Sequence, residues 1–266
     1  MSIITNKVSP LEYLTAEGIC VPHAFTTRHG GVSTGSQASL NLAYGRGDSM
    51  ENVRANIRIL ADALGFDTGK LVLTRQTHSD IVRVVTAEDA VGFCHRDYPE
   101  CDALVTDTPG VTLMVFTADC TPLLFHDPVT GAVGAAHAGW RGTAQAIGAK
   151  TVAAMVENFG CRPEDIRCAI GPNIGFCHFE TDGDVPEAMV AAFGEEAMPF
   201  VEKRGEKYYL DLKQINALSL RRCGVKHIEI SNECTMCAPD RFWSHRVTRG
   251  ERGSQGAVIT CKEGCE

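Results

Sequence analysis

Three side chains that can bind a soft metal ion or act in nucleophilic catalysis follow apolar stretches of the chain. Cys120 ends VTLMVFTADC, His137 lies near the end of AVGAAHAGW, and His78 ends LVLTRQTH. These stretches are rich in β-branched and small apolar residues and are bounded by turn residues, which is typical of buried strands. We therefore expect the three side chains to converge at one end of a sheet.

A thiolate and two imidazoles suit zinc or copper better than magnesium or calcium. Three protein ligands leave a fourth position open, as in catalytic zinc sites, where the pKa of a bound water falls to about 7. Asp119 adjoins Cys120 in the sequence and is a further catalytic candidate. In a metal-free alternative, Cys120 is a nucleophile that His137 deprotonates. The residue types alone leave both chemistries open.

A helix is expected directly after His137, with Thr143 as its N-cap and Gly160 at its end. The N-terminus of such a helix attracts anions. Arg141 lies in the same turn, and its guanidinium can bind a phosphate or carboxylate through two hydrogen bonds. The apolar stripe of this helix is formed by Ile147, Thr151, Met155 and Phe159.

A second group of cysteines begins with the CxxC motif of Cys234 and Cys237, and Cys261 and Cys265 follow downstream. Four thiolates in two pairs are a candidate structural zinc site. The competing interpretation is that these cysteines are small buried hydrophobic residues.

Composition limits the class of protein and its partners. The chain has 266 residues, 44% of them hydrophobic, with no linker or repeat, and we expect a single domain over 1–266. A net charge of −8 without a basic run argues against nucleic acid. No apolar run approaches the roughly 20 residues of a membrane span. Twelve cysteines without a recognisable export signal indicate reduced thiols and a cytoplasmic location.

The remaining pattern predicts more strands than helices. A helix is expected from Asp48 or Ser49 to Leu64, with Gly65 as its stop, and another from Asp211 to Cys223. Strands are expected at 21–27, 71–76, 81–85, 101–107, 166–171, 208–210, 225–231 and 257–261, besides those of the central stretch. Because strands and helices do not alternate strictly, we expect an α+β fold with mixed β-sheets flanked by helices.

The motifs of the chain resemble those of laccase-domain proteins. RHGGVS, SLNL, QTH, DALVTD, TADCTPLLF, HAGWRGT, IGPNIG and RFWSHR occur in the order found in that family, from Arg28 to Arg246. The family is also called multicopper polyphenol oxidase, FAMIN-type purine nucleoside phosphorylase and peptidoglycan editing factor. The resemblance implies a fold similar to the catalytic domain of the cytotoxic necrotizing factor deamidases, and zinc or copper bound by His78, Cys120 and His137.

The resemblance also implies what the protein acts on. Family activities are phosphorolysis of adenosine, inosine, guanosine and methylthioadenosine, and deamination of adenosine, so nucleoside and phosphate are the expected partners. By position, substrate or phosphate is bound by Asn41, Arg46, Gln76 and Arg141. The bacterial name implies a different substrate, because it denotes amide hydrolysis of serine-containing peptidoglycan precursors, which would use the same metal-bound water. A zinc-stabilised interaction module is the non-enzymatic alternative, and no oligomeric state is predicted.

Overall fold

Two six-stranded sheets form the centre of the protein. The computed structural model describes residues 2–45, 47–93 and 99–262. The first sheet has the order β1 (Ile3–Val8), β2 (Leu11–Ala16), β3 (His23–Thr26), β15 (Gln255–Thr260), β7 (Thr112–Thr117) and β4 (Leu71–Leu73). Only the β4–β7 pair in it is parallel.

The second sheet contains the strands that flank Cys120 and His137. Its order is β14 (His227–Ile230), β10 (Arg167–Ile170), β8 (Thr121–His126), β9 (Val133–Ala138), β6 (Ala103–Thr106) and β5 (Val82–Val84). It is also mixed, since its two outer pairs are parallel and its inner pairs antiparallel. A small third sheet consists of β11 (Glu180–Thr181), β13 (Lys207–Leu210) and β12 (Val201–Arg204).

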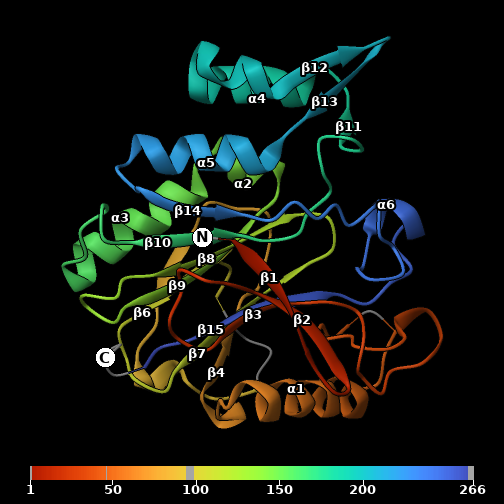
Figure 1. The fold of residues 1–266 in the computed structure, drawn as a ribbon, viewed down its shortest axis with the longest axis vertical. Coiled ribbons are helices and arrows are strands. Elements are labelled where there is room, and N and C mark those ends of the chain that lie inside the picture. The colour runs from red at the N-terminus through yellow and green to blue at the C-terminus, as the bar shows by residue number, and fades with distance from the viewer. Residues whose placement is uncertain (1, 46, 94–98, 263–266) are drawn as a thin grey trace.

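Helices cover the outer faces of the two large sheets (Figure 1). The α-helices are α1 (Met50–Leu64), α2 (Trp140–Ala144), α3 (Ile147–Phe159), α4 (Asp184–Phe193), α5 (Leu212–Arg222) and α6 (His245–Thr248). Short 3-10 turns span Gly35–Gln37, Thr68–Lys70, Ala87–Asp89 and Gly194–Phe200. α1 packs on the first sheet, and α3 and α5 pack on the second, which gives four layers.

The central strands are continuously apolar because both faces of their sheet are covered. In β8, Leu124 packs into the core between the two sheets, whereas Leu123 and Phe125 belong to the core beneath α3 and α5. Every residue of β8 and β9 is buried. A strand buried on both faces shows a run of hydrophobic residues rather than an alternation. The expected α+β architecture with mixed sheets is confirmed, whereas the likeness to the necrotizing factor domain stays a prediction.

Helix boundaries were predicted with mixed success. The Ser49 hydroxyl accepts a hydrogen bond from the amide of Asn52 and caps α1, and Gly65 ends that helix with a left-handed φ of 74°. The prediction of Thr143 as an N-cap is wrong. A short helix, α2, precedes α3, so Thr143 lies inside α2, where its hydroxyl accepts a hydrogen bond from Asn216.

Among the residues that the structure describes, nine cysteines are free thiols, and Cys20 is disulfide-bonded, so the expectation of reduced thiols is wrong for Cys20. Among the described residues, no helix combines the length and the hydrophobicity needed to cross a bilayer.

Candidate metal and substrate site

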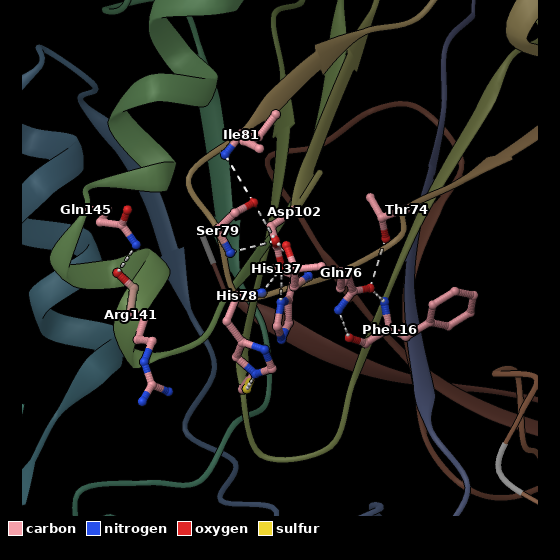
Figure 2. Close-up of polar contacts among 12 residues, drawn as sticks. Thr74, Gln76, His78, Ser79, Ile81, Asp102, Phe116, His137, Arg141 and Gln145 are labelled. Atoms are coloured by element: carbon pink, nitrogen blue, oxygen red, sulfur yellow. Dashed lines mark hydrogen bonds and ion pairs between the residues drawn. The ribbon is translucent and has the colours of Figure 1, made fainter. Parts of the chain in front are cut away.

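The structure brings His78, Cys120 and His137 together where the chain passes from the first sheet to the second. His78 lies between β4 and β5, Cys120 lies in the turn between β7 and β8, and His137 is the penultimate residue of β9. Their ligand atoms all lie within 4.8 Å of one another. The Cys120 Sγ is 3.8 Å from His78 Nε2, and the two imidazole rings are 4.9 Å apart at 79° (Figure 2).

The buried carboxylate of Asp102 orients both histidines. Its Oδ1 accepts a hydrogen bond from His137 Nδ1 at 2.7 Å, which leaves His137 Nε2 to face the thiol and a metal. The same carboxylate accepts the backbone amides of Thr77, His78 and Ser79 and the Ser79 hydroxyl (Figure 2). One acidic side chain therefore fixes the loop of one ligand and the ring of another.

The pKa values of Cys120, His137 and Asp102 depend on one another. Burial alone would raise the pKa of Cys120, but His137 and His78 outweigh it and lower that pKa to about 6. Burial alone would lower the pKa of His137, but the Cys120 thiolate and Asp102 raise it to about 9. Burial opposes ionisation of Asp102 as well, yet His137 and Ser79 bring its pKa to about 2. Without a metal, Cys120 is thus a thiolate at neutral pH.

The turn before Cys120 is held in an unusual backbone conformation. Asp119 has a φ of 86°, in the left-handed region that non-glycine residues rarely occupy. Its carboxylate accepts hydrogen bonds from the Thr235 hydroxyl at 2.6 Å, the Ser244 hydroxyl at 3.1 Å and the Arg246 amide at 2.7 Å. The side chain of Asp119 therefore anchors the turn to a distant loop and positions Cys120.

The donor set fits zinc or copper. In tetrahedral zinc geometry, a thiolate sulfur and an imidazole nitrogen lie about 3.6 Å apart, close to the 3.8 Å between Cys120 and His78. A carboxylate behind a metal-binding histidine is also typical of zinc sites. Magnesium and calcium prefer oxygen ligands, which these three side chains do not offer.

Two pockets meet at His78 and Cys120. The larger has a volume of about 270 Å³, and its wall includes Tyr44, Arg75, Gln76, Phe116, Arg252 and Ser254. The smaller has a volume of about 120 Å³, and its wall includes Asp119, Trp140, Arg141, Ile174, Phe179 and Leu212. Gln76 and Arg141 lie on opposite sides of the two histidines (Figure 2).

The four predicted substrate residues differ in position. Gln76 lines the larger pocket, but its amide exchanges two hydrogen bonds with the backbone of Phe116. Arg141 lines the smaller pocket, where its guanidinium stacks on Trp140 at 4.2 Å. Asn41 is fully buried and lines neither pocket. Its Oδ1 instead accepts hydrogen bonds from the backbone amides of Ala43 and Ser254. Arg46 lies outside the described residues.

Sequence analysis missed Asp102 and the pocket residues Tyr44, Phe116 and Arg252. Asp102 had a detectable signal, because an acidic residue directly before the buried strand β6 requires hydrogen-bond donors. The other three residues come from separate segments and carry no local pattern.

The predicted pairing of the CxxC motif with Cys261 and Cys265 is not found. The buried Cys261 thiol donates to the carbonyl of Gly131 and lies outside the thiol cluster, and Cys265 is outside the described residues. Cys234 and Cys237 instead lie beside Cys177 and His178. The chain order of the cysteines did not reveal this, because one of the four side chains of the cluster is a histidine.

Residues 22–262 match the family described as multi-copper polyphenol oxidoreductase laccase. The chain belongs to this laccase-domain family. A laccase-domain relative from Deinococcus radiodurans, named purine nucleoside phosphorylase, is 45% identical over 94% of this chain and 92% of its own length. Purine nucleoside phosphorylase YlmD of Geobacillus stearothermophilus is 40% identical over 90% of this chain and 89% of its own length. The crystal structure of YlmD from that organism matches with a TM-score of 0.92 at 36% identity, covering 98% of this chain and 100% of that one. This laccase-domain chain thus shares its fold with a family whose relatives are named as enzymes.

Proposed function

We propose that the chain is a zinc-dependent purine nucleoside phosphorylase. The observation that carries this proposal is a three-ligand site that opens into two pockets of different character. A closed structural site would instead surround its metal with protein ligands. The open, pocket-lined arrangement therefore favours an enzyme over a zinc-stabilised interaction module.

The metal would be held by His78, Cys120 and His137. When bound, zinc would supply a Lewis-acid centre that polarises a substrate oxygen or a water molecule. Asp102 keeps His137 in the tautomer that presents Nε2, and Asp119 keeps the Cys120 turn in place. Copper is the alternative metal for the same donors.

The two pockets differ in chemistry, and each suits a different substrate. Tyr44 and Phe116 in the larger pocket offer aromatic surface for a purine. Arg141 in the smaller pocket offers a guanidinium that makes no ion pair with any described residue. We assign the nucleoside to the larger pocket and phosphate to the Arg141 side.

In phosphorolysis, a phosphate oxygen bonds to C1′ of the ribose while the bond from C1′ to the purine nitrogen breaks. The electron pair of that bond leaves with the purine, which then takes up a proton. Arg141 would neutralise the phosphate and orient it toward C1′. The proposed substrates are adenosine, inosine, guanosine and methylthioadenosine. Deamination of adenosine to inosine at the same site, and a cytoplasmic location that supplies both substrates, belong to the same proposal.

The test compares Arg141→Ala with Arg221→Ala, an exposed arginine at the end of α5 and outside both pockets. Ribose-1-phosphate formation from inosine should fall roughly ten- to a hundredfold in kcat/KM for phosphate in Arg141→Ala, as the loss of one charged contact implies. Adenosine deamination uses no phosphate and should fall much less. Equal losses in both reactions would contradict the assignment of Arg141 to phosphate.

A second candidate function rests on the chain of hydrogen-bonding groups from Asp102 through His137 to Cys120. With the pKa of Cys120 near 6 and that of His137 near 9, the pair is a thiolate and an imidazolium without metal. This arrangement would suit a metal-free Cys–His hydrolase acting on an amide. Hydrolysis of a serine-containing peptidoglycan precursor would instead use a water molecule activated by the bound metal. Retention of amide hydrolysis after complete chelation, together with its loss on alkylation of Cys120, would support this candidate over the first.

A further inference from the structure

A second cluster of soft ligands lies apart from the site described above. It consists of Cys177, His178, Cys234 and Cys237, whose ligand atoms all lie within 4.8 Å of one another. Cys177 and His178 belong to the segment between β10 and β11, and the two other cysteines follow β14 (Figure 1). Two loops that are more than 50 residues apart in sequence thus present four ligands to one point.

The spacing of these atoms matches tetrahedral zinc. In such a site, two thiolate sulfurs lie about 3.8 Å apart, and a sulfur and an imidazole nitrogen about 3.6 Å apart. The Sγ atoms of Cys177 and Cys237 are 3.6 Å apart. His178 Nδ1 lies 3.1 Å from Cys177 Sγ, 3.7 Å from Cys234 Sγ and 3.4 Å from Cys237 Sγ. Three thiolates and one imidazole are a common ligand set of structural zinc sites.

The backbone around the cluster supports the same geometry. The amide of Gly175 donates to Cys234 Sγ at 3.1 Å, the kind of bond that orients a metal-binding thiolate. A β-carbon at Gly175 would lie 3.3 Å from the sulfurs of both Cys177 and Cys234, so glycine leaves room for the two sulfurs. The amides of Cys237 and Ala238 donate to the carbonyl of Cys234 and fold the CxxC motif into a tight turn.

The charge around the cluster is also suitable. Zinc with three thiolates carries a net charge of −1. Arg204, Lys213 and Asp211 line the pocket that Cys177 and Cys234 border, and the net positive charge of these three side chains offsets this excess. The Lys213 ammonium is held there by the carbonyls of Ser231 and Glu233.

We propose that Cys177, His178, Cys234 and Cys237 bind one zinc ion in a closed, structural site. This site would join the loop after β10 to the loop after β14. Thr235 lies between the two cysteines of the motif, and its hydroxyl binds Asp119 in the turn of the first site. The second zinc would therefore fix a loop that supports the first site, without contacting substrate.

The test is zinc stoichiometry in protein expressed with zinc and purified without chelator. We expect two zinc ions per chain in the wild type and one each in Cys237→Ser and His178→Ala. Cys120→Ala should also retain one, because it removes only the other ion. The matched control is Cys223→Ser, a half-buried cysteine at the end of α5, which should retain both ions.

A second measurement needs no variant of the second cluster and therefore does not depend on the folding of such a variant. Cobalt substituted into wild-type protein should give the thiolate-to-cobalt charge-transfer and intense visible absorption of a tetrahedral three-thiolate site. Cys120→Ala should keep these bands, since its remaining ligands are those of the second cluster.

Two results would overturn the proposal. One is a single zinc in the wild type that Cys120→Ala removes completely, with no cobalt bands left in that variant. The other is a disulfide between Cys177 and Cys237, found by mass spectrometry of freshly purified protein, because that bond consumes two of the four ligands.

Discussion

Asp102 is the residue on which both histidines of the first site depend. It binds the ring of His137 and the backbone of His78, and it has no role as a metal ligand in the arrangement described. Outer groups of this kind typically contribute ten- to a hundredfold to metal affinity. The ligands are therefore preorganised by a residue that lines neither pocket.

We expect Asp102→Asn to weaken zinc binding at the first site by roughly ten- to a hundredfold, because the amide cannot stabilise the same tautomer and charge of His137. Competition with a chromophoric chelator measures this affinity. Ser79→Ala, which removes only one donor to Asp102, should have a smaller effect. If the two variants bind zinc equally well, Asp102 does not orient the ligand.

At this scale, the sequence was informative where one residue type carries the chemistry. His78, Cys120 and His137 could be predicted to converge because each follows or ends a buried strand. His178 could not be recognised as part of a cluster, since its partners come from another loop and a lone histidine has no pattern. Asn41 was carried over as a substrate residue by resemblance, yet its amide supports backbone around Ser254.

At the scale of elements, the turn between β7 and β8 is supported from outside its own hairpin. The Thr235 hydroxyl donates to Asp119 across 116 positions in the sequence, and both groups are buried. The positive φ of Asp119 is costly by itself, so it depends on such contacts. The geometry of the Cys120 turn is thus determined by the loop after β14.

We expect Thr235→Val to lower the free energy of unfolding by about 1–3 kcal/mol, because it removes a donor from a buried carboxylate. Urea denaturation monitored by tryptophan fluorescence measures the change. Thr235→Ser keeps the hydroxyl and should stay closer to the wild type. The expectation fails if the valine and serine variants are equally stable.

Elements with simple burial were the easiest to predict. The strands β8 and β9 are buried on both faces, so each shows a run of hydrophobic residues. The helix α3 is buried on one face, so it shows a hydrophobic stripe. β1 was missed because its residues are half-buried or exposed and half of them are polar. The start of α3 was misplaced because the short helix α2 intervenes, and the break between them has Ala146 at a φ of 57°, which no sequence pattern indicates.

For the whole molecule, buried histidines link stability to pH. Burial, with the nearby Arg167 charge, lowers the pKa of His126 to about 4, and burial also lowers the pKa of His23. An unfolded histidine has a pKa near 6.5, so between pH 6.5 and 4 His126 binds more protons in the unfolded chain than in the folded one, and His23 contributes in the same direction. Stability therefore falls as the pH falls through this range.

We expect His126 to lower the free energy of unfolding by roughly 1–2 kcal/mol when the pH falls from 7 to 5. Urea denaturation at both values in the wild type and in His126→Gln measures it, because the difference in pH dependence isolates this residue. The variant should lose less stability on acidification. Parallel losses in both proteins would show that His126 does not contribute.

The position of β15 has a consequence for how the protein is made. This strand is the last of the described residues in chain order, yet it lies between β3 and β7 in the middle of the first sheet. While the ribosome is still adding residues before Gln255, β3 and β7 lack the partner that joins them, and their edges stay open to pairing with other chains. All three ligands of the first site have been synthesised by then. Completion of the first sheet must therefore wait until β15 has emerged, and a nascent chain stalled before it should require chaperone protection.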